Sequence, residues 1–509
     1  SPVVGLSATC TGIDATTVTI ETDCSEGVGI RIVGLPDIAV RESLLRVTTA
    51  LLGYGYRIPG RRILFNLAPA DLRKEGSGYD LPIAIGLLAV SGQIRVPRCG
   101  EFIIMGELSL DGRVRPVNGC LPIACHARES GFKGCIFPRE SAFEAVDIEG
   151  LEVYGVDALS DVIEILSGED DSARLLVRPS GRKRPVERRY NDFKYVKGQF
   201  EARRGLEIAA AGGHSCILIG NPGSGKSMMA SCLPTILPPM TKEESIETSA
   251  IYSISGNGGS CGLMRERPFR TPHHSASLVS IIGGGACSTP GEISLAHNGV
   301  LYLDEIAQFP KAVLDAMRQP LEEGRVTISR ARYKVTYPSS VMLIASMNPC
   351  PCGYWGDGTS RCHCTPSQRL AYLNRLSGPF LDRMDLHIWC SQPRPDELTD
   401  TSFSESSDAM KERIVRAREI QSERFRGENI FTNSQMDTEM LRRYCNIGER
   451  GTEYLKEVLR KMNLSARAFS RILKLSRTIA DLSGEKFISL QNIAEAVRFR
   501  SLDRNNLYE

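Results

Sequence analysis

The stretch "SCILIGNPGSGKSMMA", residues 215–230, constrains the fold of this chain more than any other. An apolar run typical of a short buried strand leads into a loop that fits G-x-x-x-x-G-K-[ST], and a helical pattern follows. Glycines let the backbone N–H groups of such a loop turn toward phosphate oxygens at a helix N-terminus. The predicted phosphate-binding residues are Gly220, Asn221, Pro222, Gly223, Ser224, Gly225, Lys226 and Ser227.

Two further apolar runs end in polar side chains, a pattern typical of P-loop nucleoside triphosphatases. "NGVLYLDEIAQF" places Asp304 and Glu305 at its strand end, and "SVMLIASMNPC" places Asn348 at another. In this arrangement Lys226 contacts the β- and γ-phosphates of ATP, while Ser227 and Asp304 bind Mg²⁺. Glu305 orients and deprotonates the attacking water, and Asn348 senses the γ-phosphate. The alternation predicts a three-layer α/β core with a parallel sheet and ligands at the C-terminal strand ends.

The length of 509 residues predicts two to four domains. Residues 1–167 mix strand-like and helical patterns, which indicates a compact α/β unit. Residues 168–192 are polar and charge-dense, and we interpret them as a linker whose basic run "GRKRPVERR" is either a solvated hinge or a nucleic-acid contact. Residues 193–395 hold the ATPase motifs, and residues 396–509 carry helical periodicity that predicts an all-helical domain.

The composition excludes some broad classes of protein. A net charge of +2 gives no general attraction to nucleic acid or membrane, so polyanion binding must come from local patches. No apolar run is long enough to span a bilayer, so we expect a cytoplasmic protein with no membrane partner. Most of the sixteen cysteines are scattered, which is typical of reduced thiols in protein cores.

Four cysteines are the exception, because Cys350, Cys352, Cys362 and Cys364 fall within fifteen residues as C-x-C…C-x-C. Four thiolates at this spacing suit a closed tetrahedral Zn²⁺ site, and the short loop between them has no core of its own. The sequence therefore predicts a structural zinc site directly after Asn348. Free thiols and an oxidation-sensitive pair are the alternatives.

The stretch "EEGRVTISRARYKVTYPSS" has two β-rich arms around a basic centre and predicts a hairpin. Arg330, Arg332 and Lys334 would gather at its tip, where they could hold DNA phosphates without reading sequence. An exposed basic turn at a subunit contact is the alternative. Farther upstream, His273 and His274 lie in a Gly-rich insertion that we interpret as a pore loop rather than a metal site.

The motifs "GNPGSGKS", "GEISLAHNGVLYLDE", "ASMNPCPCGY" and "GPFLDRMDLHI" together resemble the ComM (YifB-type) magnesium-chelatase-like AAA+ ATPases. The resemblance implies a homo-hexameric ring with ATP between neighbouring subunits and the basic hairpin in the central pore. It implies that Arg383 is an arginine finger and that Arg467 is the sensor arginine of the helical domain, with Arg471 as the competing candidate. It also places the adenine near "YVKGQ", which contains Val196 and Gln199.

The N-terminal region resembles the Lon-type protease domain, a fold similar to ribosomal S5 domain 2, most clearly in "MGELSLDGRVRPVNG". In the Lon pattern a serine nucleophile works with a lysine, and both must lie within hydrogen-bond reach. Here Gly78 stands at the serine position with Ser77 one place early, and Leu121 stands at the lysine position. The resemblance therefore implies a catalytically dead protease fold, reused for binding.

Taken as a whole, the resemblance implies an ATP-driven DNA motor. It would carry out branch migration and helicase activity on branched recombination intermediates, in the setting of natural transformation. The alternative is an AAA+ ATPase that remodels a protein or a metal-insertion partner, as magnesium chelatase subunits do. Three cations on the hairpin favour DNA, whereas Tyr333 on the same hairpin favours a polypeptide. An ATP-dependent protease would need the Ser–Lys dyad, and Gly78 and Leu121 stand at the positions of that serine and lysine.

Overall fold

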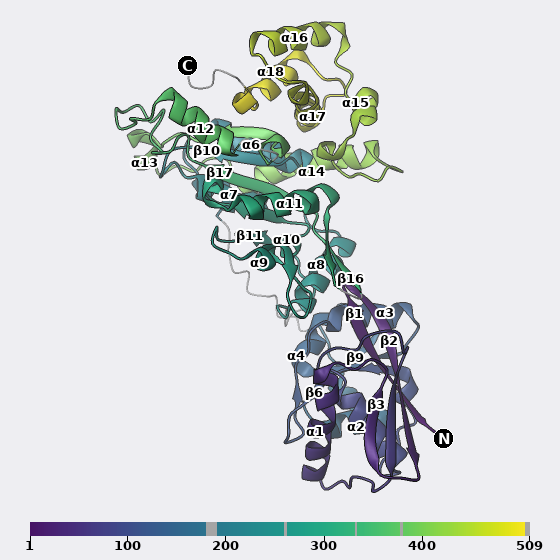
Figure 1. Cartoon of the computed structure of the whole chain (residues 1–509). Helices are drawn as coiled ribbons and strands as arrows, with labels where there is room; N and C mark the ends of the chain where they lie inside the picture. The colour runs from purple at the N-terminus through teal and green to yellow at the C-terminus, as the bar shows by residue number, and fades with distance from the viewer. Residues whose placement is uncertain (180–190, 259–261, 331–332, 377–379, 504–509) are drawn as a thin grey trace.

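The computed structural model describes residues 1–179, 191–258, 262–330, 333–376 and 380–503. Figure 1 shows an elongated molecule with an N-terminal body at one end, a central sheet with its helices, and a helical region at the other end. Arg332 and residues 180–190 of the proposed linker lie outside the described residues. No helix in the described part of the chain is long and apolar enough to cross a membrane.

The N-terminal body contains the strands that the sequence predicts. Its first sheet has the order β1-β2-β4-β3, with β3 parallel to β4 and the other pairs antiparallel. Helices α1 and α2 pack together on this sheet, and α2 is buried along nearly its whole length. The bounds are β1 Val3–Thr11, β2 Asp14–Ser25, β3 Gly29–Val33, β4 Arg62–Ala68, α1 Ile38–Gly53 and α2 Asp80–Val90.

A second, parallel sheet completes this body in the order β5-β8-β9, beside the short antiparallel pair β6-β7. Helix α3 begins at Cys120 and packs against β8 and against helix α8 of the central region. The bounds are β5 Phe102–Ile104, β6 Glu107–Leu108, β7 Val114–Arg115, β8 Gly134–Pro138, β9 Glu152–Val156, α3 Cys120–Glu129, α4 Arg139–Ala142 and α5 Leu159–Ser167.

The central sheet is parallel throughout and has the order β11-β14-β17-β10-β18. Its strands are buried on both faces, which is the reason they appear in the sequence as continuous apolar runs. The strand bounds are β10 Cys216–Ile219, β11 Phe269–Arg270, β14 Val300–Leu303, β17 Met342–Met347 and β18 Leu386–Trp389. The surrounding helices include α6 Phe200–Gly212, α7 Lys226–Cys232, α8 Lys242–Ile254, α11 Lys311–Glu323 and α12 Pro366–Leu376.

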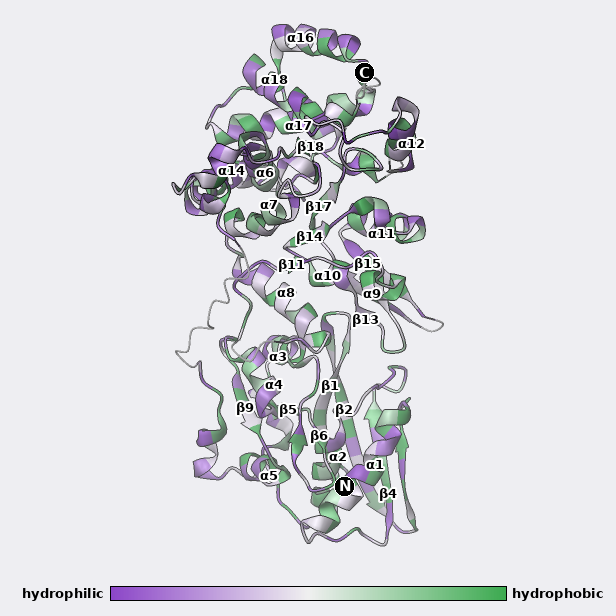
Figure 2. Ribbon diagram, turned by 90° about the vertical axis from the view of Figure 1, so that its left-hand side faces the viewer, coloured by the Kyte–Doolittle hydropathy of each residue, from purple (hydrophilic) through white to green (hydrophobic). Residues whose placement is uncertain are grey.

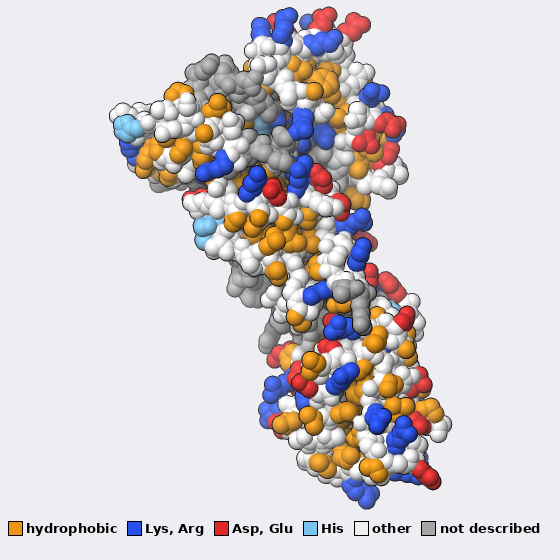
Figure 3. Space-filling view, viewed as in Figure 1, with side chains coloured by type: hydrophobic (Ala, Val, Ile, Leu, Met, Phe, Trp, Pro, Cys, Tyr) orange, Lys and Arg blue, Asp and Glu red, His pale blue; other side chains and the backbone are white. Residues whose placement is uncertain are grey.

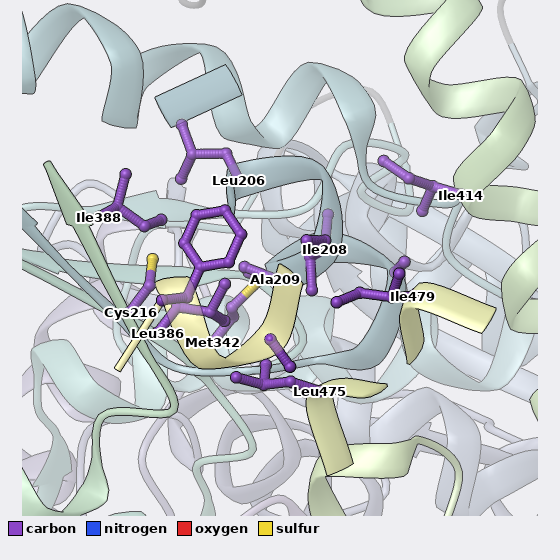
Figure 4. Packing of buried hydrophobic residues seen from close by; sticks show 14 of the residues in the cluster. Leu206, Ile208, Ala209, Cys216, Met342, Leu386, Ile388, Ile414, Leu475 and Ile479 are labelled. Atoms are coloured by element: carbon purple, nitrogen blue, oxygen red, sulfur yellow. The ribbon is translucent and has the colours of Figure 1, made fainter. Parts of the chain in front are cut away.

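Alternate residues of each strand belong to two different hydrophobic cores. Cys216 and Leu218 of β10 face one cluster, whereas Ile217 and Ile219 face the other. The first cluster contains side chains of α6 and of the C-terminal helices, and Figure 4 shows Leu206, Ile208, Ala209, Ile414, Leu475 and Ile479 converging on these strands. The second contains Val313 and Met317 of α11. The sheet is therefore covered on both sides, which confirms the predicted three-layer parallel core.

The C-terminal region is helical, as its periodicity predicts. Helix α14 packs against α6 and α17, so it connects the helical region to the sheet. In Figure 2 helix α16 alternates between hydrophilic and hydrophobic colours, which is typical of a helix with one buried side. The bounds are α13 Pro395–Thr399, α14 Ser407–Arg424, α15 Thr438–Tyr444, α16 Gly448–Lys461, α17 Ala466–Leu482 and α18 Leu490–Arg498.

Two insertions leave the core on the side of the N-terminal body. Strands β15 and β16, at Arg325–Ser329 and Lys334–Pro338, form the predicted antiparallel hairpin. Beside it lie α9 Leu278–Ile282, β12 Gly283–Gly284, β13 Thr289–Pro290 and α10 Glu292–Leu295. The hydroxyl of Tyr333 at the hairpin tip is 3.3 Å from Oε1 of Glu75, so the tip contacts the N-terminal body.

Candidate nucleotide-binding site

The phosphate-binding loop lies at the C-terminal end of β10 and leads directly into α7, which begins at Lys226. Gly223 and Gly225 have φ values of 80° and 87°, a conformation that glycine adopts at little cost. At Gly220 an added Cβ would lie 2.4 Å from Oγ of Ser224 and 2.9 Å from the Cys390 carbonyl oxygen. The glycines are therefore required by the shape of the loop.

Lys226 and Asn348 meet at this loop, although 122 residues separate them. The ammonium group of Lys226 donates to Oδ1 of Asn348 at 2.9 Å and also to the carbonyl oxygens of Gly220 and Asn221. Burial lowers the pKa of Lys226 from its ordinary value. A phosphate anion would offer this half-buried cation stronger acceptors than the neutral oxygens that it contacts in this structure.

The residues expected to bind Mg²⁺ form a connected cluster of oxygen atoms. Oδ1 of Asp304 accepts hydrogen bonds from the hydroxyl groups of Tyr302 at 3.0 Å and Ser346 at 2.7 Å. The Tyr302 hydroxyl also lies 3.4 Å from Oγ of Ser227. Carboxylate and hydroxyl oxygens suit Mg²⁺, which when bound would neutralise charge on the β- and γ-phosphates. The donor set therefore fits the expected metal.

The sequence reasoning missed Tyr302 and Ser346. Burial raises the pKa of Tyr302, so its hydroxyl keeps its proton and donates to Asp304. Ser346 has a second contact, because its Oγ accepts from the backbone N–H of Glu305 at 3.0 Å. Glu305 itself has a φ of 51°, which turns the chain sharply at the strand end. A polar side chain within each buried apolar run was the signal that could have revealed these two residues.

Gln199 lies against the loop, whereas Val196 is buried in the core below it. The amide of Gln199 donates to the Ser224 carbonyl oxygen at 2.8 Å, and its Oε1 accepts from the backbone N–H of Ser391 at 3.0 Å. Gln199 also lines a cavity of about 430 Å³ beside Gly220 and Trp355. This cavity is large enough for part of a nucleotide.

Arg383 and Arg471 lie at the N-terminal end of β18, whereas the phosphate-binding loop lies at the C-terminal end of the neighbouring strand β10. Arg383 precedes β18 and contacts the C-terminal half of α11, where its Nη1 is 3.2 Å from Oε1 of Glu322. Arg471 of α17 forms an ion pair with the buried Asp385. Burial, with the charges of Arg471 and Arg318 nearby, lowers the pKa of Arg383.

Arg467, the other sensor candidate, is in the first turn of α17 and is exposed. Arg383 and Arg471 do not lie at the C-terminal strand ends where Lys226 and Asp304 lie.

The four clustered cysteines converge in space. Their sulfur atoms all lie within 4.8 Å of one another, with Cys350 and Cys352 3.3 Å apart and Cys350 and Cys362 3.8 Å apart. Four sulfurs around a tetrahedral Zn²⁺ at about 2.3 Å would lie about 3.8 Å apart. The cluster is therefore compatible with a zinc site, and it also borders a cleft of about 800 Å³ that contains Glu305 and Asn348.

The positions that the sequence analysis compares with the Lon dyad make packing contacts. A Cβ at Gly78 would lie 2.5 Å from Cε of Met105. Leu121 is buried, and its backbone N–H donates to Oγ of Ser253 in helix α8 at 3.3 Å. Ser77 instead donates to Oε2 of Glu107 at 2.9 Å.

Of the three predicted hairpin cations, two lie in the described residues. Lys334 is exposed at the start of β16, whereas Nε of Arg330 donates to Oγ of Ser288 at 2.9 Å. Figure 3 shows positive and negative side chains interspersed over one face of the molecule. The rings of His273 and His274 have centroids 4.1 Å apart and are tilted by 34°, and the described residues place no third metal ligand beside them.

A phosphate-binding loop, an Asp-Glu strand end and a polar strand tip on one parallel three-layer core define an AAA+ P-loop ATPase. The family models that match are "Magnesium chelatase, subunit ChlI" over residues 192–398, "Subunit ChlI of Mg-chelatase" over residues 20–141, and "Magnesium chelatase, subunit ChlI C-terminal" over residues 404–500. Together they match well over half of the chain.

Similar proteins extend this match to almost the full length. The chain is 43% identical over 495 residues to the uncharacterized protein YifB of Escherichia coli (strain K12), covering 97% of this chain and 96% of that protein. It is 42% identical over 497 residues to competence protein ComM of Haemophilus influenzae, with the same coverage of 97% and 96%. The chain belongs to the YifB/ComM family of magnesium-chelatase-like AAA+ ATPases.

A more distant similarity extends to replication proteins. The chain is 22% identical over 331 residues to DNA replication licensing factor mcm7-B of Xenopus laevis, covering 61% of this chain and 40% of that protein.

Proposed function

We propose that this protein is an ATP-driven motor that acts on DNA as a homo-hexameric ring. In this proposal it migrates branches and unwinds strands in recombination intermediates during natural transformation. The name of the 42% identical relative, competence protein ComM, supports that setting. The similarity to a DNA replication licensing factor supports DNA as the partner.

The observation that carries the ring proposal is the separation of Arg383 from the loop that contains Lys226. Arg383 and Arg471 lie at the N-terminal end of β18, and the phosphate-binding loop lies at the C-terminal end of the neighbouring strand β10. An arginine that stabilises charge on a γ-phosphate must contact it, so these side chains cannot serve the nucleotide of their own chain. A neighbouring copy would supply Arg383 as the arginine finger. Arg467 remains the proposed sensor arginine of the helical domain, with Arg471 as the competing candidate.

Within one site, we assign the residue roles from the contacts described above. Lys226 binds phosphate, Asp304 and Ser227 hold Mg²⁺, and Glu305 deprotonates water. Asn348, which accepts a hydrogen bond from Lys226, would sense the γ-phosphate. Gln199 and Val196 remain the residues proposed to lie near adenine.

The basic hairpin is the proposed DNA contact. Lys334 is exposed, and Arg330 would have to leave Ser288 to bind a phosphate. Arg332, the third cation, lies outside the described residues. Phosphate contacts of this kind fix position and carry no sequence information, as a motor on DNA requires.

The alternative function is remodelling of a protein or of a metal-chelatase-type partner. The magnesium chelatase family models favour it, since they are named for a chelatase subunit. Tyr333 on the hairpin is also suited to gripping a polypeptide.

We also propose four segments for the chain, namely 1–167 as a catalytically dead Lon-like domain, 168–192 as a linker, 193–395 as the ATPase core and 396–509 as the helical domain. The matches at 20–141, 192–398 and 404–500 support this division. Zn²⁺ in the four-cysteine cluster is the proposed structural metal. The cytoplasm is the proposed location, because DNA and ATP meet there.

The test is strand displacement on a labelled four-way junction and a forked duplex with ATP and Mg²⁺. We expect ATP-dependent product from the wild type and none from Lys226→Ala, which should lose nucleotide binding. An ATPase that no DNA stimulates and that displaces no strand would refute the DNA motor and favour protein remodelling.

A further inference from the structure

Asn221 joins the phosphate-binding loop to the four-cysteine cluster. Its side-chain Nδ2 donates to the carbonyl oxygens of Gly353 at 2.8 Å and Trp355 at 3.0 Å. The residue is only 8% exposed, so these bonds are shielded from water. Gly353 and Trp355 both belong to the turn that follows Cys352. The side chain of Asn221 therefore extends to the cysteine turn and not to a phosphate.

The orientation of that turn is set by the sulfur atoms. The backbone N–H of Trp355 donates to Sγ of Cys350 at 3.4 Å, and that of Tyr354 donates to Sγ of Cys352 at 3.5 Å. With these N–H groups directed at sulfur, the carbonyl oxygens of the same turn face outward to Asn221. Such bonds are strongest when the sulfur is a thiolate, because the acceptor is then charged.

Steric contacts make the coupling tight. Gly353 has a φ of 86°, and a Cβ added there would lie 3.1 Å from Cδ and Cγ of Pro222. The turn therefore packs directly against the loop. Asn348, which accepts from Lys226, precedes Cys350 by only two residues. The cysteine turn thus adjoins both polar contacts of the phosphate-binding loop.

Four thiolates within 4.8 Å of one another repel unless a cation lies between them. Cys350 and Cys362, 3.8 Å apart, match the sulfur spacing of a tetrahedral zinc site, whereas a disulfide requires about 2.05 Å. Loss of the metal would let the sulfurs separate and would turn the N–H groups of Tyr354 and Trp355 away. The carbonyl oxygens that accept from Asn221 would then move as well.

We propose that Zn²⁺ in this cluster holds the phosphate-binding loop in its nucleotide-binding form through Asn221. The affinity of the site for adenine nucleotides, ATP included, is then higher with Zn²⁺ bound in the cluster than without it. The inference rests on the proposed function only for nucleotide binding at Lys226, not for action on DNA.

Tryptophan fluorescence can report nucleotide binding in this protein. Its two tryptophans, Trp355 and Trp389, have ring centroids 6.1 Å apart and both line the cavity beside Gln199. Titration with Mg-ADP followed by tryptophan fluorescence gives the nucleotide Kd of the full-length protein. Zinc content is measured in the same sample with a chromogenic chelator after thiol modification.

The decisive experiment compares the ADP Kd of four samples. These are the wild type and Asn221→Ala, each with zinc bound and each after chelation. We expect about one zinc per chain in both proteins. Chelation should weaken ADP binding by the wild type about tenfold, the effect of losing two hydrogen bonds. Asn221→Ala should show a similar loss with its zinc retained, and chelation should then weaken it less than twofold further. Returning zinc should restore the wild type only.

Cys287→Ser is the matched control, because it removes an exposed thiol outside the cluster. It should keep wild-type zinc content and ADP affinity, whereas Cys362→Ser should lose both. Three results would overturn the inference. The first is no zinc in the purified protein, and the second is wild-type ADP affinity in Asn221→Ala. The third is a chelated Asn221→Ala protein whose loss of ADP affinity equals the product of the loss from the substitution and the loss from chelation. Should strand displacement fail while the cycle behaves as expected, only the DNA role is refuted.

Discussion

Replacing Tyr302 by phenylalanine tests the part of the site that the sequence did not reveal. The change removes one hydroxyl group, which donates to Asp304 at 3.0 Å and lies 3.4 Å from Ser227. The ring should stay in place, because it is buried and stacks on Phe269 with centroids 6.0 Å apart. The variant therefore disturbs the proposed Mg²⁺ ligands without creating a cavity.

The structure sets the size of the effect. A hydrogen bond to a charged acceptor contributes about 1.5–3 kcal/mol. Ser346 still donates to the same oxygen of Asp304 at 2.7 Å, so the carboxylate keeps one of its two hydrogen bonds. We therefore expect a free-energy loss at the low end of this range. About 1.4 kcal/mol corresponds to a tenfold change in an equilibrium constant. We expect the Mg²⁺ concentration for half-maximal ATP hydrolysis to rise about tenfold.

The assay is steady-state ATP hydrolysis as a function of Mg²⁺ at saturating ATP. Excess Mg²⁺ should restore most of kcat in Tyr302→Phe, because the hydroxyl positions the ligands and does not take part in the chemistry. Tyr54→Phe, which removes a hydroxyl bonded to Gly112 in the N-terminal body, is the control and should behave as the wild type. An unchanged Mg²⁺ dependence would refute this reasoning, as would a fall in kcat that no Mg²⁺ concentration restores.

Three further outcomes are expected. Glu305→Gln should bind ATP normally but lose at least about 100-fold in kcat, the usual contribution of a general base; turnover at the wild-type rate would contradict that role. Lys334→Ala should weaken binding to all DNA sequences alike and lower the salt dependence, the slope of log K against log salt, by about one; an unchanged slope would mean that the hairpin does not contact phosphate. Asp385→Asn should lower the free energy of unfolding in urea by about 3 kcal/mol, because it removes the carboxylate that pairs with Arg471. The control Asp315→Asn changes an exposed carboxylate and should leave this free energy unchanged. Equal stability of Asp385→Asn and the wild type would contradict the ion pair.

The same pair has a defined pH dependence. Burial alone would raise the pKa of Asp385, but the hydrogen bond from His214 at 2.8 Å and the charges of His214 and Arg471 hold the pKa well below its usual range. A depressed pKa contributes stability that is complete above the unfolded value of about 3.9 and is lost as pH falls toward the folded value. Asp385→Asn should therefore flatten the stability profile below about pH 4, measured by urea unfolding.

Local patterns were sufficient to predict much of the architecture. The apolar runs before Gly220, Asp304 and Asn348 are strands of one parallel sheet, and the loop, carboxylates and amide lie at their C-terminal ends. These features depend on short-range chemistry: glycine in a turn, burial on two faces and a polar residue at a strand end. The convergence of four cysteines also follows from their spacing, because fifteen residues of chain can fold around one ion.

Contacts across the sheet could not be inferred in this way. The order β14-β17-β10 is not the order in the chain, so only the folded structure places Ser346 on Asp304 and Asn348 on Lys226. The sequence shows Arg383 and Arg471 only as arginines near motifs. Their position at the N-terminal end of β18 depends on how α11 and α17 pack.

The sequence by itself thus determined the chemical groups of the nucleotide site, because each motif is a local constraint on the backbone. The tertiary structure decided which groups act together. Asn221 and Gly353 are 132 residues apart, and the bond between them exists only because the cysteine turn packs on the phosphate-binding loop. Leu121 likewise stands where a lysine is expected, but only the packing of α3 on α8 shows that its backbone contacts Ser253. Long-range contacts of this kind depend on the whole core and have no signature in a short stretch of sequence.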